Sequence, residues 1–395
     1  MRVVAAPYVL TGAGVLHDAA LALDGDTVAA VGPRAEVEAR FGSAEALDAV
    51  LLPALVNAHT HLELSYLQNR VPGGTGLADW VRMLVATRAA HPDPTAALAG
   101  IDEAVLELDE AGVAAVGDVT NTLAALPALR RAGLVGRVFH EVFGFAPARV
   151  EAALARAADA SEAAGEPGPG LTICLSPHAV YSTNPTVLAR LLRAGPASIH
   201  LAEHAEERAF CARAEGPFAH LNRTLGAEVA PLARSAVAAV APHLRADTLC
   251  VHCVDVDDED LALLAASGAT VVLCPRSNLH IGGALPDLPR LLAAGIPLAV
   301  GTDSLASSPS LSPLAELAAL ARAFPQIPAE TLLPLAWNGA AVGAPSVGRL
   351  AAGTAPGVVA APLAGARPAD PARWLLEERA DRPFTWIARH RSPDR

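Results

Sequence analysis

The sequence predicts an α/β protein: a (β/α)8 (TIM) barrel with a small β-sandwich domain formed by both ends of the chain. Eight short apolar runs end in polar residues, and Ala/Leu-rich helical stretches follow them, as expected of parallel βα units buried on both faces. A barrel of eight such units brings the ends of its strands to one mouth. A doubly wound open sheet is the competing architecture, but it does not need histidines at so many strand ends. The runs are Leu51–His61, Val113–Asn121, Val135–Phe145, Leu171–Ser182, Ser198–Glu203, Thr248–Val254, Ala269–Ser277 and Pro297–Ser304.

Helices are predicted in the segments between these runs. Pro94–Ala111 has apolar residues at helical spacing, and Arg149–Gly165 is Ala-rich and amphipathic. Asp257–Gly268 begins with four acidic residues, which is typical of a capped helix N-terminus.

The two ends of the chain have a different pattern. Short strands are predicted at Val9–Gly12, Ala20–Leu23 and Val28–Gly32, with a tight turn at Asp24–Asp26. The segment that follows Gly348 is also β-like, although its last thirty or so residues give mixed signals. We therefore expect residues 1–50 and 348–395 to form one composite β domain beside a barrel of residues 51–347.

Composition excludes several classes of function. The net charge of −12 argues against nucleic acid or an anionic membrane as a partner. No uncharged apolar run reaches the roughly 18 residues of a membrane span, and no secretory leader pattern is present at the N-terminus. Five cysteines are too few for a disulfide framework in a chain of 395 residues. We expect a cytoplasmic protein with buried free thiols; the oligomeric state is not determined, and a homodimer is compatible with the sequence.

The chain contains no lysine, so all 29 of its basic residues are arginine. This excludes a phosphate-loop lysine, a Schiff-base lysine and a carbamylated lysine that bridges two metal ions.

Four residues at predicted strand ends are candidate metal ligands. His59 and His61 point the same way, because side chains alternate along a strand, and His200 and Asp303 end the fifth and eighth runs. Each alone has a simpler explanation, such as a hydrogen-bonded core histidine or a helix N-cap. Together they match a catalytic metal site, which uses three or more protein ligands and leaves one position for water.

Two further strand-end residues are candidates for handling protons. Glu203 lies three residues after His200, and His252 ends the neighbouring sixth run. A carboxylate and an imidazole beside a metal-bound water are suited to hydrolysis. The alternatives are a solvated loop carboxylate for Glu203 and a residue that only orients a ligand for His252.

These motifs resemble the amidohydrolase superfamily, specifically its mononuclear deaminase and chlorohydrolase branch. The matching segments are His59-Thr60-His61, His200-Leu201-Ala202-Glu203, His252 and Gly301-Thr302-Asp303-Ser304. The resemblance implies one divalent ion, zinc or iron, held by His59, His61, His200 and Asp303, which lowers the pKa of bound water. It further implies that Glu203, His252 and Asp303 are catalytic and together move the protons as ammonia leaves an amine-bearing ring carbon.

Other segments suggest the substrate. Ser176-Pro177-His178 resembles a substrate-binding segment of adenosine-type deaminases, and Glu63 lies on the same side as the first two histidines, where it could bind a ribose diol. Arg276, at the seventh strand end, could pair with a ligand carboxylate or with a neighbouring acid.

The forms His59–Glu63 and Cys274–His280 are similar to the aminodeoxyfutalosine deaminases of menaquinone biosynthesis, whose substrate is an adenine nucleoside bearing a benzoate. A lid is predicted at Gly73–Arg82, in which Trp80 could stack on a ring and Arg82 could contact an anion. Glu141, at the third strand end, has no assigned role. The alternatives are methylthioadenosine, S-adenosylhomocysteine or adenosine as substrate, a guanine or cytosine deaminase, a chlorohydrolase, and a binding module without activity.

Overall fold

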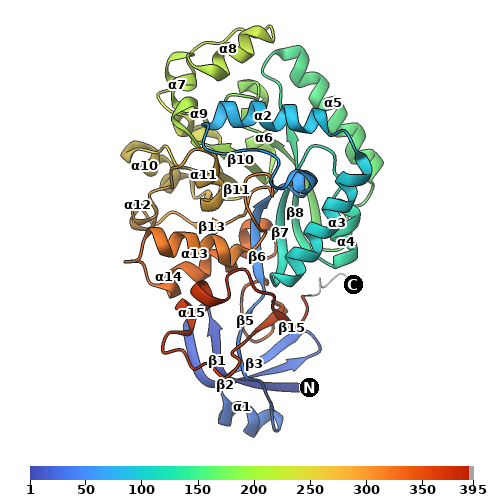
Figure 1. The fold of residues 1–395 in the computed structure, drawn as a ribbon, viewed down its shortest axis with the longest axis vertical. Helices are drawn as coiled ribbons and strands as arrows, with labels where there is room; N and C mark the ends of the chain where they lie inside the picture. Colours follow the sequence, from blue (N-terminus) through green and yellow to red (C-terminus); the bar gives the residue numbers. More distant parts are fainter. Residues whose placement is uncertain (391–395) are drawn as a thin grey trace.

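The computed structural model describes residues 1–390 and contains eight parallel strands in two four-stranded sheets (Figure 1). Isolated bridges join the edges of the two sheets, between Ala179 and His200 and between Thr60 and Asp303. Most residues of these strands are buried, as expected for strands covered on both faces. One sheet is β6 (Leu55–Thr60), β7 (Val113–Thr120), β8 (Val135–Val142) and β9 (Leu171–Pro177); the other is β10 (Ala197–Leu201), β11 (Thr248–His252), β12 (Thr270–Leu273) and β13 (Leu298–Val300).

Helices follow the strands and surround the two sheets (Figure 1). The three helices predicted from sequence are observed to within two residues at each end, and Asp257 forms a capping box with Asp260 on α10. No helix within residues 1–390 is long and apolar enough to cross a membrane. The helices are α2 (Leu77–Ala90), α3 (Pro94–Glu110), α4 (Leu126–Ala132), α5 (Pro147–Ala164), α6 (Pro185–Ala194), α7 (Ala205–Arg213), α8 (Pro217–Thr224), α9 (Ala236–Val240), α10 (Asp258–Ser267), α11 (Pro275–Ile281), α12 (Leu288–Ala293), α13 (Pro313–Ala323), α14 (Ala329–Leu332) and α15 (Pro371–Glu378), with short 3₁₀ segments η1 (Leu62–Leu67), η2 (Ala241–His243), η3 (Leu333–Trp337) and η4 (Gly339–Val342).

The two ends of the chain meet in one β-sheet, as expected. Its path runs β15-β14-β5-β1-β2-β3, and β4 pairs with β1 beside this path. Hydrogen bonds join all of these strands into a single sheet, where we expected a sandwich. Residues 391–395 of the expected domain lie outside the described part of the chain. The elements are β1 (Arg2–Thr11), β2 (Gly14–Asp24), β3 (Thr27–Pro33), α1 (Arg34–Phe41), β4 (Glu45–Ala46), β5 (Ala49–Pro53), β14 (Val358–Pro362) and β15 (Thr385–Ala388).

The first predicted strand is two strands in the structure. β5 belongs to the terminal sheet, where it pairs with β14 antiparallel and with β1 in parallel, whereas β6 pairs with β7 in the central region. Only Ala54 separates β5 from β6. An unbroken apolar run hides this division because both strands are buried, and hydrophobicity alone does not show which sheet a buried strand joins.

Candidate metal centre and active site

His59, His61 and Asp303 meet at the end of β6. The Nε2 atoms of His59 and His61 lie 3.7 and 3.5 Å from the Asp303 Oδ1 atom. The two imidazole rings are 4.9 Å apart between centroids, which agrees with the same-side placement expected from strand alternation. These three side chains are all buried and could share one ion.

The backbone brings Asp303 to β6 from the segment that follows β13, the last strand of the other four-stranded sheet. The amides of Thr302 and Asp303 both donate to the His59 carbonyl, at 2.9 and 3.0 Å. Gly301 permits this approach, because a Cβ atom at that position would lie 2.7 Å from the His59 backbone. Asp303 itself has a left-handed backbone with φ of 57°, which is uncommon for a residue with a side chain.

Hydroxyl groups fix the orientation of the Asp303 carboxylate. Ser277 and Ser307 donate to its Oδ2 atom at 2.5 and 3.2 Å, which leaves Oδ1 facing the histidines. Burial alone would raise the pKa of Asp303, but the nearby imidazoles of His59, His61 and His252 hold it well below its ordinary range. Asp303 is therefore an ionised oxygen donor.

His200 completes the group of candidate ligands from β10. Its Nε2 atom lies 3.2 Å from Nε2 of His61, and its Nδ1 atom lies 3.1 Å from the His178 carbonyl. Donation from Nδ1 to that carbonyl leaves Nε2 as a lone-pair donor. Burial lowers the pKa of both His61 and His200, so both imidazoles are held neutral, the form that binds metal ions.

Both ring nitrogens of His59 are buried and have no hydrogen-bond partner among the described residues. Buried polar atoms in native proteins nearly always have a partner. A metal ion bound by His59, His61, His200 and Asp303 would satisfy one of these nitrogens, and the set of nitrogen and oxygen donors suits zinc.

Glu203 and His252 face each other beside this group. The Oε2 atom of Glu203 lies 3.7 Å from Nε2 of His252, and Asn278 contacts the other ring nitrogen, Nδ1, at 3.0 Å. Burial is the main cause that raises the pKa of Glu203 well above its ordinary range, and it lowers the pKa of His252 to about 3. A carboxyl that can hold a proton near neutral pH therefore faces a neutral imidazole.

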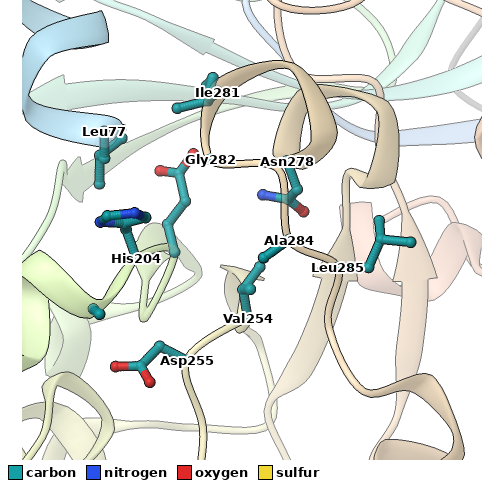
Figure 2. A pocket seen from close by; sticks show the side chains of 11 residues that line it. Leu77, His204, Val254, Asp255, Asn278, Ile281, Gly282, Ala284 and Leu285 are labelled. Atoms are coloured by element: carbon teal, nitrogen blue, oxygen red, sulfur yellow. The ribbon is translucent and has the colours of Figure 1, made fainter. Parts of the chain in front are cut away.

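A cavity of about 310 Å³ opens beside Glu203 (Figure 2). Leu77 at the start of α2 and His204 lie together on one side of it. The rest of its lining is mostly apolar: Ala205, Val254, Asp255, Asn278, Ile281, Gly282, Ala284 and Leu285. Glu203 and Asp255 are the two acidic residues in this lining.

Two of the predicted substrate-binding residues lie close to the ligands. The His178 ring lies 4.8 Å from the His200 ring, its Nδ1 atom contacts the Ser182 hydroxyl at 2.6 Å, and burial lowers its pKa to about 4. Glu63 is buried, and its Oε2 atom accepts hydrogen bonds from Thr120 and Thr122. Protein groups thus already occupy one carboxylate oxygen of Glu63, and Oε1 lies 3.5 Å from Arg88.

The other three predicted contacts are paired with protein groups or buried in the structure. The Arg276 guanidinium donates to Glu316 at 2.6 Å and to the Ser310 carbonyl at 2.7 Å, so the neighbouring-acid role is the one observed. Arg276 is moreover on helix α11, because β12 ends earlier than predicted. In the predicted lid, Arg82 is exposed and pairs with Asp79, whereas the Trp80 side chain is buried.

Sequence reasoning gave no role to several residues that shape the site. Asn278, Ser277 and Ser307 contact the candidate catalytic side chains His252 and Asp303, yet serine and asparagine are too common in loops to be singled out. Glu141 is buried with its Oε1 atom 3.5 Å from His200, and burial raises its pKa to about 7. Its position at a strand end was the only available signal.

Residues 50–365 match the family model described as the Amidohydrolase family. A 5-methylthioadenosine/S-adenosylhomocysteine deaminase of Nitratidesulfovibrio vulgaris is 33% identical over 364 residues, which cover 86% of this chain and 78% of the relative. An aminodeoxyfutalosine deaminase of Deinococcus radiodurans is 32% identical over 346 residues, which cover 80% of this chain and 78% of the relative.

Solved structures share the fold. Helicobacter pylori aminofutalosine deaminase in complex with methylthio-coformycin superposes with a TM-score of 0.83 at 22% identity, covering 96% of both chains. An adenosine deaminase from Xanthomonas campestris with bound zinc gives a TM-score of 0.79 at 24% identity, covering 99% of this chain and 93% of the other.

Proposed function

Because the chain belongs to the amidohydrolase family, we propose that it catalyses the hydrolytic deamination of an adenine nucleoside, in which water replaces the purine 6-amino group and ammonia leaves. One observation carries this proposal: a buried group of metal-ligand type lies beside a proton-handling pair, Glu203 and His252, and Glu203 also lines a cavity. A protein that only binds a metal ion has no need of the second pair.

We infer that the ion is one zinc per chain, with iron as the alternative, held by His59, His61, His200 and Asp303. The unpaired buried nitrogens of His59 support this assignment. When bound, the ion would act as a Lewis acid that activates water at neutral pH.

The chain's own residues supply the proton transfers. Glu203, whose raised pKa lets it hold a proton, takes one from the attacking water and delivers it to the ring nitrogen next to the amine-bearing carbon. Donation from Asn278 Nδ2 to Nδ1 of His252 places the imidazole proton on Nε2, on the side of Glu203, where it can stabilise developing negative charge. Asp303, held by two serines, accepts the second proton of the attacking water and delivers it to the amino group, which leaves as ammonia.

For the nucleoside, we propose 6-amino-6-deoxyfutalosine as the first candidate and methylthioadenosine or S-adenosylhomocysteine as the second. The Deinococcus relative and the His59–Glu63 motif support the first. The Nitratidesulfovibrio relative supports the second, as does the pairing of Arg276 with Glu316, which leaves that guanidinium unavailable for a benzoate. His178, close to His200, is the candidate contact to the nucleoside in either case.

We also infer that the two four-stranded sheets are halves of one (β/α)8 barrel. The parallel bridges at both junctions between the sheets support this description. It would place the ends of all eight strands around one mouth, as in barrel enzymes generally.

A panel assay tests the reaction. We expect the purified protein to change the ultraviolet absorbance of at least one of adenosine, S-adenosylhomocysteine, methylthioadenosine and aminodeoxyfutalosine, because adenine and hypoxanthine absorb differently. No change with any of the four would contradict the nucleoside proposal.

Metal analysis tests the centre separately. We expect about one divalent ion per chain, and loss of activity on chelation that zinc restores. Full activity after complete removal of the ion would rule out the metal-dependent mechanism.

A further inference from the structure

Glu207 is a fully buried carboxyl group that the proposed mechanism does not use. It lies on α7, four residues after Glu203. Its Oε1 atom accepts the backbone N–H of Glu203 at 2.7 Å, and its Oε2 atom accepts the backbone N–H of Ala202 at 3.2 Å. Both carboxylate oxygens are therefore directed at the turn that carries Glu203.

This turn has a backbone conformation that needs support. Ala202 has a left-handed φ of 51°, which is unfavourable for a residue with a Cβ atom and persists only where the surroundings hold it. The conformation of such a turn sets the direction of the side chain that follows it. The orientation of Glu203 thus depends on the contacts that maintain Ala202.

The same turn also holds the neighbouring strand end. The carbonyl of Ala202 accepts the amides of Val254 and Asp255, both at 2.8 Å, and the carbonyl of Leu201 accepts the amide of Cys253 at 3.0 Å. His252 and Cys253 are left-handed as well, with φ of 78° and 50°. The two strand ends that carry Glu203 and His252 are consequently linked through the residue that Glu207 holds.

We propose that Glu207 is a positioning residue that fixes the turn at Ala202 and Glu203, so that the Glu203 carboxylate faces His252. The inference rests on the proposed function, because it assigns Glu207 a role in directing the proton carrier of that reaction. Glu207 acts through backbone contacts and touches neither the substrate nor the candidate metal ligands.

The charged and titratable groups around Glu207 are consistent with this positioning role. Burial raises its pKa to about 8, although the N–H groups of Glu203 and Ala202 oppose that shift. The adjacent Arg208 does not pair with it, because its guanidinium is bonded to Asp255, Asp257 and Asp260. The other titratable groups near Glu207 are buried or partly buried and offer no opposite charge: Tyr181, Glu203, Cys211, Cys253 and Asp255.

The nearly isosteric variant Glu207→Gln tests the proposal. An amide has one oxygen and one NH₂ group, so it cannot accept both backbone N–H groups at once. We expect kcat to fall by about tenfold to a hundredfold, the range for a misplaced catalytic group, with KM and metal content nearly unchanged. The matched control is Glu215→Gln, the same change at an exposed residue just beyond α7, which should behave as wild type.

A second variant separates positioning from general packing. Glycine adopts left-handed φ values readily. Ala202→Gly therefore removes the backbone strain at residue 202, and the turn then depends less on its hydrogen bonds with Glu207. In the double variant with Glu207→Gln, we expect kcat to recover at least roughly threefold over Glu207→Gln alone. A wild-type kcat in Glu207→Gln would overturn the proposal. So would a fall in kcat that only follows the loss of bound metal and of folded protein, with no recovery of kcat in the double variant with Ala202→Gly.

A structural readout does not depend on the substrate. A crystal structure of Glu207→Gln should show the Glu203 carboxylate moved away from its present 3.7 Å separation from His252. An unmoved carboxylate would overturn the positioning role, whereas failure of the wild-type enzyme on the nucleoside panel would overturn only the proposed reaction.

Discussion

Replacement of Gly301 by alanine should separate the strand that carries Asp303 from the strand that carries the first two histidines. A Cβ atom at position 301 would lie 2.7 Å from the Cβ, N and O atoms of His59. Ordinary carbon contacts are about 3.5–4.0 Å, so the two segments must move apart by roughly 0.8 Å or more. Most of the clash is with backbone, so a side-chain rotation cannot relieve it.

The expected cost follows from this geometry. Overpacking of this kind typically destabilises a protein by about 1–3 kcal/mol. The hydrogen bonds from the amides of Thr302 and Asp303 to the His59 carbonyl would lengthen, and Oδ1 of Asp303 would shift away from both imidazoles. A displacement approaching 1 Å at reacting groups can reduce a rate about a hundredfold.

The assay compares Gly301→Ala with Gly32→Ala, a strand glycine in the terminal sheet that has no atom within 4 Å of an added Cβ. We expect Gly301→Ala to lower the thermal unfolding midpoint, the metal content and the rate, and Gly32→Ala to change none of them appreciably. If Gly301→Ala kept its ion and a rate within about twofold of wild type, the close approach of the two strands would not be what builds the site.

Three further predictions concern single side chains. Glu203→Gln should retain the metal ion but lose roughly 10²–10⁴-fold in kcat, because general acid–base catalysis contributes about that much; an equal rate would remove Glu203 from the mechanism. Asp260→Asn should destabilise the fold by roughly 3–5 kcal/mol in thermal or urea unfolding, because the buried carboxylate pairs with Arg208 and Arg234; the exposed Asp258→Asn is the control, and equal stability of the two variants would contradict the buried network. Burial raises the pKa of Glu316 from 4.5 to about 6, so the folded state binds more protons at that group than the unfolded state. Wild type should therefore lose about 2 kcal/mol of stability relative to Glu316→Gln as the pH rises from about 3.5 to about 7, and parallel stability curves would contradict the shift.

Local spacing made much of the site predictable. The two-residue period of a strand places His59 and His61 on one side, and the three-residue gap from His200 brings Glu203 just past the end of β10, the strand that carries His200. Helices with strong caps, such as the one that begins after Asp257, were likewise predicted nearly to the residue. These features depend on neighbours in the sequence, so they survive without knowledge of the fold.

Long-range partners were not predictable in the same way. Arg276 has the sequence position of a ligand contact, yet a buried Glu316 forty residues later binds its guanidinium. Glu63 likewise has one carboxylate oxygen occupied by Thr120 and Thr122. A charged side chain pairs with the partner that folding brings within reach. Burial removes water as an alternative partner, so leaving such a charge unpaired would be costly in free energy.

The sequence by itself determined the identity of the metal-ligand candidates, the proton-handling pair and the absence of a lysine bridge, because residue types and strand periodicity fix which atoms are available. Only the tertiary structure decided that Asp303 meets His59 at the junction between β6 and the segment after β13. It likewise decided that one apolar run divides between two sheets, and that a buried Glu207 supports the turn before Glu203. The physical reason is that burial and close approach depend on which segments become neighbours, and that information lies in the packing of the whole chain.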